Sequence, residues 1–344
     1  MHSVRPHEQP PNAGPAAWQI ELARGFRDPG QLLAALGLTA AACEAAPDPT
    51  AAFRLRVPRG FVGRMRPGDP RDPLLLQVLP VLAEASPVPG YVRDPVGDLA
   101  RVRTPGLLQK YAGRALLITT GACAIHCRYC FRRDYPYGEQ SAAGDQLEQA
   151  LQVIAGDPSL EEIILSGGDP LVLSDHRLGY VLDVLDDLPH VQRIRLHSRV
   201  PVVLPERIDQ GLLALLGRMR TRVVVVIHAN HAQEFDSQVA QALRNLGAAT
   251  GPVLNQSVLL RGINDSPEAI IALSRALFAA GVIPYYLHQM DRVAGGAHFA
   301  VPDADALKIL SVATANLPGY LVPKLVREMA GEPAKTLLGT FGTT

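Results

Sequence analysis

The sequence predicts an α/β protein built on a partial (β/α)6 barrel, with a mainly helical lobe at its N-terminal end. From about residue 115 onward, short apolar runs rich in β-branched residues alternate with longer helical patterns. This alternation is typical of parallel strands joined by right-handed crossover helices. A complete barrel of this type has eight strands, and six are expected here. A doubly wound sheet is the alternative architecture.

The expected strands are residues 115–120, 162–168, 193–198, 223–229, 254–260 and 284–289. Helical patterns such as "DHRLGYVLDVLDDL" and "SPEAIIALSRALFAAG" fill the intervals between them. Several of these patterns begin with Asp, Ser or Pro and end with Gly, which are the usual helix caps. The chain is therefore expected to pass repeatedly from strand to helix and back.

The first hundred residues follow a different pattern. The stretch "AAWQIELARGFRDPGQLLAALGL" indicates helices interrupted near Asp28 and Pro29, and Pro-rich connections follow it. We therefore expect three segments. They are an N-terminal helical lobe (1–100), the barrel (101–300) and a C-terminal segment (301–344).

Composition and charge argue against several classes of protein. The chain carries 33 Lys and Arg against 33 Asp and Glu, so its net charge indicates no nucleic-acid partner. No apolar run approaches the roughly 18 residues of a membrane span, and the polar start "MHSVRPHEQPPNAGP" is unlike a secretory signal. Four cysteines, three of them clustered, make a poor disulfide framework. These features predict a cytoplasmic protein without a membrane partner.

The clustered cysteines Cys123, Cys127 and Cys130 directly follow the first expected barrel strand, with the spacing C-x3-C-x2-C. A structural zinc site needs four closed ligands, and a redox C-x2-C pair leaves Cys123 unexplained. A [4Fe-4S] cluster held by three thiolates leaves one iron open to a small ligand, which accounts for the missing fourth cysteine. Neighbouring Arg128, Arg132 and Arg133 could offset part of the cluster's charge. The motif therefore favours an iron-sulfur cluster, with zinc and a redox pair as the alternatives. For the remaining Cys43 a small buried apolar role is the default.

At these residues the chain resembles the radical S-adenosylmethionine (SAM) superfamily. In that family the open iron binds the amino and carboxylate groups of SAM, and the reduced cluster cleaves it to a 5'-deoxyadenosyl radical. The resemblance extends to "LSGGDPL" and "LHSRVPV" at the ends of the second and third expected strands. It implies that SAM contacts Gly167, Gly168 and Asp169 in the first stretch and Ser198 and Arg199 in the second. Alone, Gly-Gly-Asp-Pro is also an ordinary turn sequence.

From about residue 94 to its end, the chain resembles lysine 2,3-aminomutases. The segments that carry this resemblance are "YAGRALLITTGACAIHCRYCFRR", "RLHSRVPVVLPERI", "LNQSVLLRGINDS" and "PYYLHQMDRVAGGAHF". Members of that family use the cluster, SAM and pyridoxal phosphate (PLP) to move the amino group of lysine from C2 to C3. The resemblance implies the same three cofactors here, lysine as the substrate and an external electron donor.

The resemblance also assigns roles to residues of the site. Lys335 matches the lysine that carries PLP, and among the four lysines of the chain Lys324 is its nearest competitor. The other matches are Lys110, Tyr111, Arg114 and Gln256 around PLP, Arg132 at the substrate carboxylate, and Asp291 with Glu328 at the substrate's side-chain ammonium. Asn230 and His231 recur in the family without a role that their chemistry indicates.

The terminal "GEPAKT" and the segment "PYYLHQMD" resemble a shorter bacterial branch of the family, which serves β-lysylation of elongation factor P together with a partner ligase. The resemblance therefore implies a functional link to that factor. Two other hypotheses stay open at this point. One is an aminomutase for another amino acid such as glutamate, and the other is a non-catalytic iron-sulfur regulatory protein.

Overall fold

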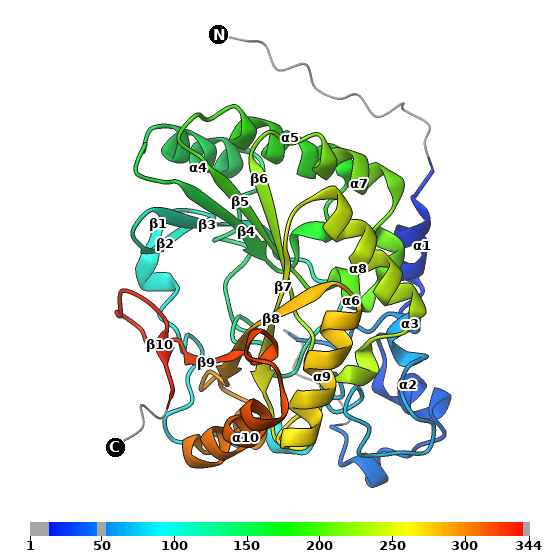
Figure 1. The fold of residues 1–344 in the computed structure, drawn as a ribbon. Helices are drawn as coiled ribbons and strands as arrows, with labels where there is room; N and C mark the ends of the chain where they lie inside the picture. The colour runs from blue at the N-terminus through cyan, green and yellow to red at the C-terminus, as the bar shows by residue number, and fades with distance from the viewer. Residues whose placement is uncertain (1–13, 47–52, 340–344) are drawn as a thin grey trace.

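The computed structural model describes residues 14–46 and 53–339, and its core is one curled sheet (Figure 1). In the described part the sheet has ten strands, and their spatial order is their chain order. The strands are β1 (Val102–Thr104), β2 (Leu107–Tyr111), β3 (Arg114–Thr120), β4 (Glu162–Gly167), β5 (Arg193–Ser198), β6 (Arg222–Ile227), β7 (Val253–Leu259), β8 (Val282–Gln289), β9 (Lys324–Arg327) and β10 (Thr336–Leu337).

The strands from β3 to β9 pair in parallel, and β1, β2 and β10 add antiparallel edges. Because each parallel strand is added on the same side of the one before, the sheet has no point where the order reverses. A doubly wound sheet requires such a reversal, so the topology is that of a partial barrel. The α/β class and the parallel core are confirmed. The expected six strands correspond to β3–β8, and the four-residue β9 adds a seventh parallel strand that was too short to recognise.

Helices follow the outer side of the curled sheet (Figure 1). They are α4 (Asp145–Ala155), α5 (Asp175–Asp186), α6 (Val200–Val203), α7 (Gln210–Gly217), α8 (Ser237–Ala249), α9 (Pro267–Ala279) and α10 (Asp303–Asn316). Side chains cap four of them, and two of these caps, Asp236 and Ser266, are the residues that begin the predicted helical patterns. The caps are Ser174, Asp209, Asp236 and Ser266, each accepting a hydrogen bond from a backbone N–H of the first turn.

The N-terminal part contains the short helices α1 (Ala17–Ala23), α2 (Pro29–Ala35) and α3 (Arg59–Val62). Asp28 caps α2 and Pro29 occupies its first position, which confirms the predicted interruption. Buried side chains of this part, among them Trp18 and Phe61, belong to the same apolar cluster as the side chains packed between the barrel strands and the surrounding helices. The N-terminal part therefore shares its core with the barrel. The division into three segments at residues 100 and 300 stays a prediction.

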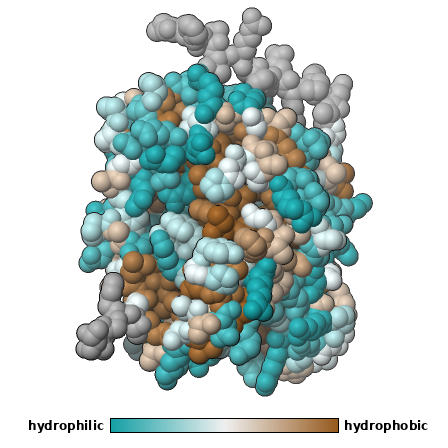
Figure 2. Space-filling view, in the orientation of Figure 1, coloured by the Kyte–Doolittle hydropathy of each residue, from teal (hydrophilic) through white to brown (hydrophobic). Residues whose placement is uncertain are grey.

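The surface is mixed in character. Figure 2 shows hydrophilic residues over most of one face, with hydrophobic residues gathered near its centre. Within residues 14–46 and 53–339, no helix is both long and apolar enough to cross a membrane.

Candidate active site

A cavity of about 450 Å³ opens at the carboxyl ends of the parallel strands, and all the predicted site residues line it. This volume lies within the usual range for small-molecule sites. The predicted residues in its wall are Lys110, Tyr111, Arg114, Cys123, Cys127, Cys130, Arg132, Gly167, Gly168, Asp169, Ser198, Arg199, Gln256, Asp291, Glu328 and Lys335. They come from segments that are far apart in the sequence, the most distant being Lys110 and Lys335. The fold therefore brings them together.

The three cysteines lie on the loop between β3 and α4, and each is half-buried. Burial raises the pKa of Cys130 to about 11, with Cys127 adding to the effect, and burial also raises the pKa of Cys123. Among the described residues, no three His, Cys, Asp or Glu side chains are arranged to bind one metal ion. A [4Fe-4S] cluster makes a different demand, because each cysteine binds its own iron. Three thiols around one cavity meet that demand.

The backbone of the cysteine loop lies directly against the end of β4. Gly168 N donates to Thr120 O at 2.7 Å, and Asp169 N donates to Ala122 O at 2.8 Å. A Cβ at Gly168 would lie 2.2 Å from the Ala122 carbonyl oxygen, and Gly167 has a φ of 121°. Only glycine tolerates this approach and this dihedral angle. The glycines therefore position the start of the cysteine loop, a requirement separate from any ligand contact.

The side chains of Asp169 and Ser198 bind each other across the ends of β4 and β5. Oδ1 of Asp169 accepts hydrogen bonds from Ser198 Oγ at 2.7 Å and from Leu171 N at 3.0 Å, and Oδ2 accepts one from Arg199 N at 2.7 Å and one from Val200 N at 3.2 Å. Burial raises the pKa of Asp169 to about 6, although these hydrogen bonds act to lower it. The carboxylate thus acts as a clamp that fixes the backbone around the predicted SAM contacts.

A run of alternating charges crosses the cavity from Lys335 to Arg132. Lys335 Nζ pairs with Oε2 of Glu328, whose Oε1 lies 2.9 Å from Lys110 Nζ. Lys110 in turn lies 2.7 Å from Oδ1 of Asp98, whose Oδ2 accepts from Arg132 Nε at 2.6 Å. Burial alone would raise the pKa of Glu328, but the two ammonium groups lower it to about 2. Because each charged group lies beside one of opposite sign, these side chains hold one another in place in the cavity wall.

Asp98 is a residue that the sequence did not indicate. It lies in the Pro-rich connection before β1, where neither strand nor helix periodicity marks which side chains point inward. It is 1% exposed and lines the cavity. Because it binds both Lys110 and Arg132, it connects a predicted PLP contact with the predicted carboxylate contact.

Asp291 lies in the cavity wall after β8, and no side-chain partner is found for it among the described residues. Burial raises its pKa to about 7, with Glu328 adding to the effect. A half-buried carboxylate with no cation in direct contact is costly. Asp291 is therefore suited to receive a positively charged group.

Histidines form an inner layer of the barrel. Gln256 Nε2 lies 2.8 Å from His228 Nε2 and 3.4 Å from His197 Nδ1. Burial lowers the pKa of His228 and of His288 to about 3, so both rings are neutral near pH 7. The alternation of strand side chains could have indicated His197, because it lies two residues after the cavity-lining Arg195 on β5.

Aromatic rings line the Lys335 side of the cavity. The Arg114 guanidinium lies 4.6 Å from the ring centre of Tyr111, its partner in the β2–β3 pairing. Burial raises the pKa of Tyr111 to about 12. Lys335 Nζ lies 6.0 Å from the ring centre of Tyr286. This surface combines flat rings with cations.

Of the remaining residues, Asn230 lines the cavity and is buried, while His231 follows it and accepts a hydrogen bond from Gln233 N. Lys324 also reaches the cavity wall but is exposed. Cys43 lies in a 3-10 turn of the N-terminal part, half-buried beside its apolar core.

No protein-family model matches the chain. It is 46% identical to the L-lysine 2,3-aminomutase of Escherichia coli (strain K12) over 322 residues, which cover 93% of this chain and 94% of that protein. It is 42% identical to the L-lysine 2,3-aminomutase of Haemophilus influenzae, with 93% and 95% covered. It is 33% identical to that of Clostridium subterminale, with 83% and 68% covered. On these similarities the chain belongs to the L-lysine 2,3-aminomutase family.

Proposed function

We propose that this protein isomerises L-lysine to β-lysine by moving the amino group from C2 to C3, with a [4Fe-4S] cluster, SAM and PLP as cofactors. One observation carries the proposal. A single cavity is lined by three cysteines of one loop, by the amine of Lys335 from the C-terminal segment, and by Arg132 and Asp291. Such a cavity offers room for a radical source, an amine carrier and a dibasic amino acid together.

The residues present fit the cofactors. Cys123, Cys127 and Cys130 would hold the cluster, and Lys335 would hold PLP. When bound, the cluster with SAM supplies a carbon radical for hydrogen abstraction, and PLP supplies the π-system across which the amino group migrates. Arg199 Nε is buried in the cavity wall and has no hydrogen-bond partner in the described part of the chain. It is a donor suited to the carboxylate of SAM.

The protein's own groups position the reactants. Arg132 would bind the substrate carboxylate with the part of its planar fork that Asp98 does not engage. Lys110 and Arg114 are the cations suited to a phosphate, and Tyr111 offers a ring face beside them. Glu328 keeps Lys335 in the cavity through their ion pair.

The acidic side of the cavity supports lysine as the substrate. Asp291 gains a counter-ion when an ammonium group lies beside it, and Glu328 adds negative charge nearby. Glutamate would bring a second carboxylate to the same place, where like charges repel. The charge of the cavity therefore favours a cationic side chain.

The proposal extends to a supply of β-lysine for elongation factor P, with an external one-electron donor reducing the cluster. The "GEPAKT" and "PYYLHQMD" segments support this branch. The lengths of the relatives agree with it, since the chain spans 94% and 95% of two relatives but 68% of the clostridial one.

The test is an anaerobic assay of the reconstituted protein with SAM, PLP, a reductant and either lysine, ornithine or glutamate. We expect β-lysine from lysine and little or no turnover of glutamate. Turnover of glutamate without turnover of lysine would refute the substrate assignment. Transfer of the product to elongation factor P by the partner ligase tests the wider role.

A further inference from the structure

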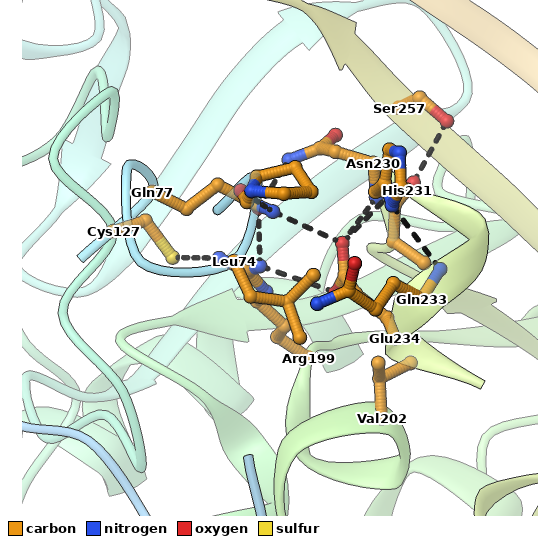
Figure 3. Close-up of polar contacts among 12 residues, drawn as sticks. Leu74, Gln77, Cys127, Arg199, Val202, Asn230, His231, Gln233, Glu234 and Ser257 are labelled. Atoms are coloured by element: carbon orange, nitrogen blue, oxygen red, sulfur yellow. Dashed lines mark hydrogen bonds and ion pairs between the residues drawn. The ribbon is translucent and has the colours of Figure 1, made fainter. Parts of the chain in front are cut away.

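A buried set of polar side chains surrounds Arg199 behind the cysteine loop (Figure 3). Arg199 Nη1 donates to Sγ of Cys127. Its Nη2 donates to Oε1 of Gln77 at 2.6 Å and to Oε2 of Glu234 at 3.2 Å. Arg199 is 5% exposed to solvent, and Gln77 and Glu234 are 0% exposed. Figure 3 shows it between Cys127 on one side and Glu234 on the other.

Glu234 is fixed from several directions. It ends the 3-10 turn Ala232–Glu234 that follows β6, and its Oε1 accepts hydrogen bonds from the backbone N–H groups of Asn230 at 2.8 Å and His231 at 3.1 Å. Gln77 Nε2 lies 3.3 Å from the same oxygen. The carboxylate therefore cannot rotate away from Arg199 without breaking these bonds. The sequence indicated no chemical role for Asn230 and His231; in the structure their backbone N–H groups help to hold the Glu234 carboxylate.

Gln77 brings the N-terminal part of the chain to the cluster loop. Its backbone oxygen accepts from Arg128 N at 2.8 Å, and its side-chain oxygen also accepts from Asn230 Nδ2 at 3.0 Å. An arginine guanidinium stays protonated throughout the ordinary pH range, so it remains charged while it faces the sulfur.

We infer that Glu234 and Gln77 are positioning residues for the iron-sulfur cluster: they hold the Arg199 guanidinium against the sulfur of Cys127 and thereby raise the cluster's reduction potential. The inference rests on the proposed ligation of the cluster by Cys127. One-electron reduction adds negative charge to the cluster and its sulfurs. A fixed cation that donates a hydrogen bond to a ligating sulfur stabilises that reduced form, and the effect is large where water is excluded.

The decisive measurement is an EPR-monitored redox titration of the anaerobically reconstituted full-length protein. Gln77→Met keeps the length and charge of the side chain but removes the acceptor of Arg199. Glu234→Gln removes the ion pair, and Arg199→Lys keeps the cation but loses the planar fork. Gln233→Ala is the matched control, since Gln233 lies in the same turn but binds Arg64 and Asp72 instead. Iron and sulfide contents are measured for each protein.

We expect Gln77→Met, Glu234→Gln and Arg199→Lys to keep their iron and to have more negative midpoint potentials. A tenfold loss in the ratio of reduced to oxidised cluster corresponds to ~59 mV for one electron. Gln233→Ala should titrate as the wild type does.

The direction of the change in Glu234→Gln is itself diagnostic. Loss of a negative charge alone would make the potential less negative, whereas a displaced Arg199 makes it more negative. A less negative or unchanged potential in this variant, or an unchanged one in Gln77→Met, would overturn the inference. If either variant failed to fold, the other would decide. Because lysine plays no part in the titration, failure of the proposed function and failure of this inference are distinguishable.

Discussion

Arg132 Nε donates a hydrogen bond to Oδ2 of Asp98 at 2.6 Å, and both side chains are buried. This pair joins the cysteine loop to the Pro-rich connection before β1. Burial alone would raise the pKa of Asp98, but Arg132 and Lys110 lower it below its usual value. Asp98 is therefore ionised at neutral pH and orients two cations of the cavity at once.

Asp98→Asn should weaken lysine binding more than it slows the chemical step. The change removes the charge that orients Arg132, and a hydrogen bond to a charged group contributes ~1.5–3 kcal/mol. We expect KM for lysine to rise roughly 10- to 100-fold. Steady-state kinetics of both proteins measure it. Asp303→Asn, which breaks a more exposed pair with Arg327, is the control and should leave KM within about twofold.

The pH dependence of lysine turnover should report Asp291. Its carboxylate must be ionised to bind an ammonium group, and its pKa is raised to about 7. In kcat/KM, which reflects the free enzyme, activity should therefore rise with pH up to about 7. Asp291→Asn should lower kcat/KM strongly and remove this acidic limb. An unchanged limb in the variant would assign the titration to another group.

Lys335→Ala should lose the visible absorption of lysine-linked PLP while retaining the iron of the wild type. The reason is that the cysteine loop and the segment after β9 share a cavity but no ligand. Aminomutation should fall drastically, whereas slow SAM cleavage uncoupled from product should persist. Lys324→Ala is the matched control and should keep the absorption band. A band that depends on Lys324 instead would show that the assignment at Lys335 is wrong.

Replacing any one of Cys123, Cys127 and Cys130 with Ala should abolish SAM cleavage, because two thiolates rarely keep a stable cluster with one open iron. Iron content and the ultraviolet-visible spectrum after anaerobic reconstitution measure the loss. Cys43→Ala should reconstitute normally, since Cys43 lies in the N-terminal part beside apolar side chains. A requirement for all four cysteines would contradict a three-cysteine cluster.

Asp169→Ala should destabilise the protein without its cofactors by at least ~3 kcal/mol. The change leaves Ser198 Oγ and the backbone N–H groups of Leu171 and Arg199 without their acceptor, and each buried unsatisfied group costs ~1–3 kcal/mol. Urea denaturation at equilibrium measures the change. A loss below 1 kcal/mol would show that Asp169 is no clamp and leave SAM contact as its only role.

The alternating pattern of the barrel was readable because it repeats. The strands β3–β8 have six to eight residues, side chains cap four of the helices between them, and several of these helices end beside a glycine, so local physics marks these elements. The short strands β1, β9 and β10 have no such signal, because a strand of two to four residues is too short to show a period and exists only through its neighbours.

The sequence by itself determined the elements with a local signature: the strand–helix alternation, the helix caps, the C-x3-C-x2-C loop and, through family resemblance, the residues of the cavity wall. Only the tertiary structure decided which charges meet. Asp98, Gln77 and Glu234 lie in irregular segments far from their partners in sequence, and their contacts form when the N-terminal part packs against the barrel ends. No local propensity encodes such contacts, because the free energy of a buried polar group depends on partners that folding alone supplies.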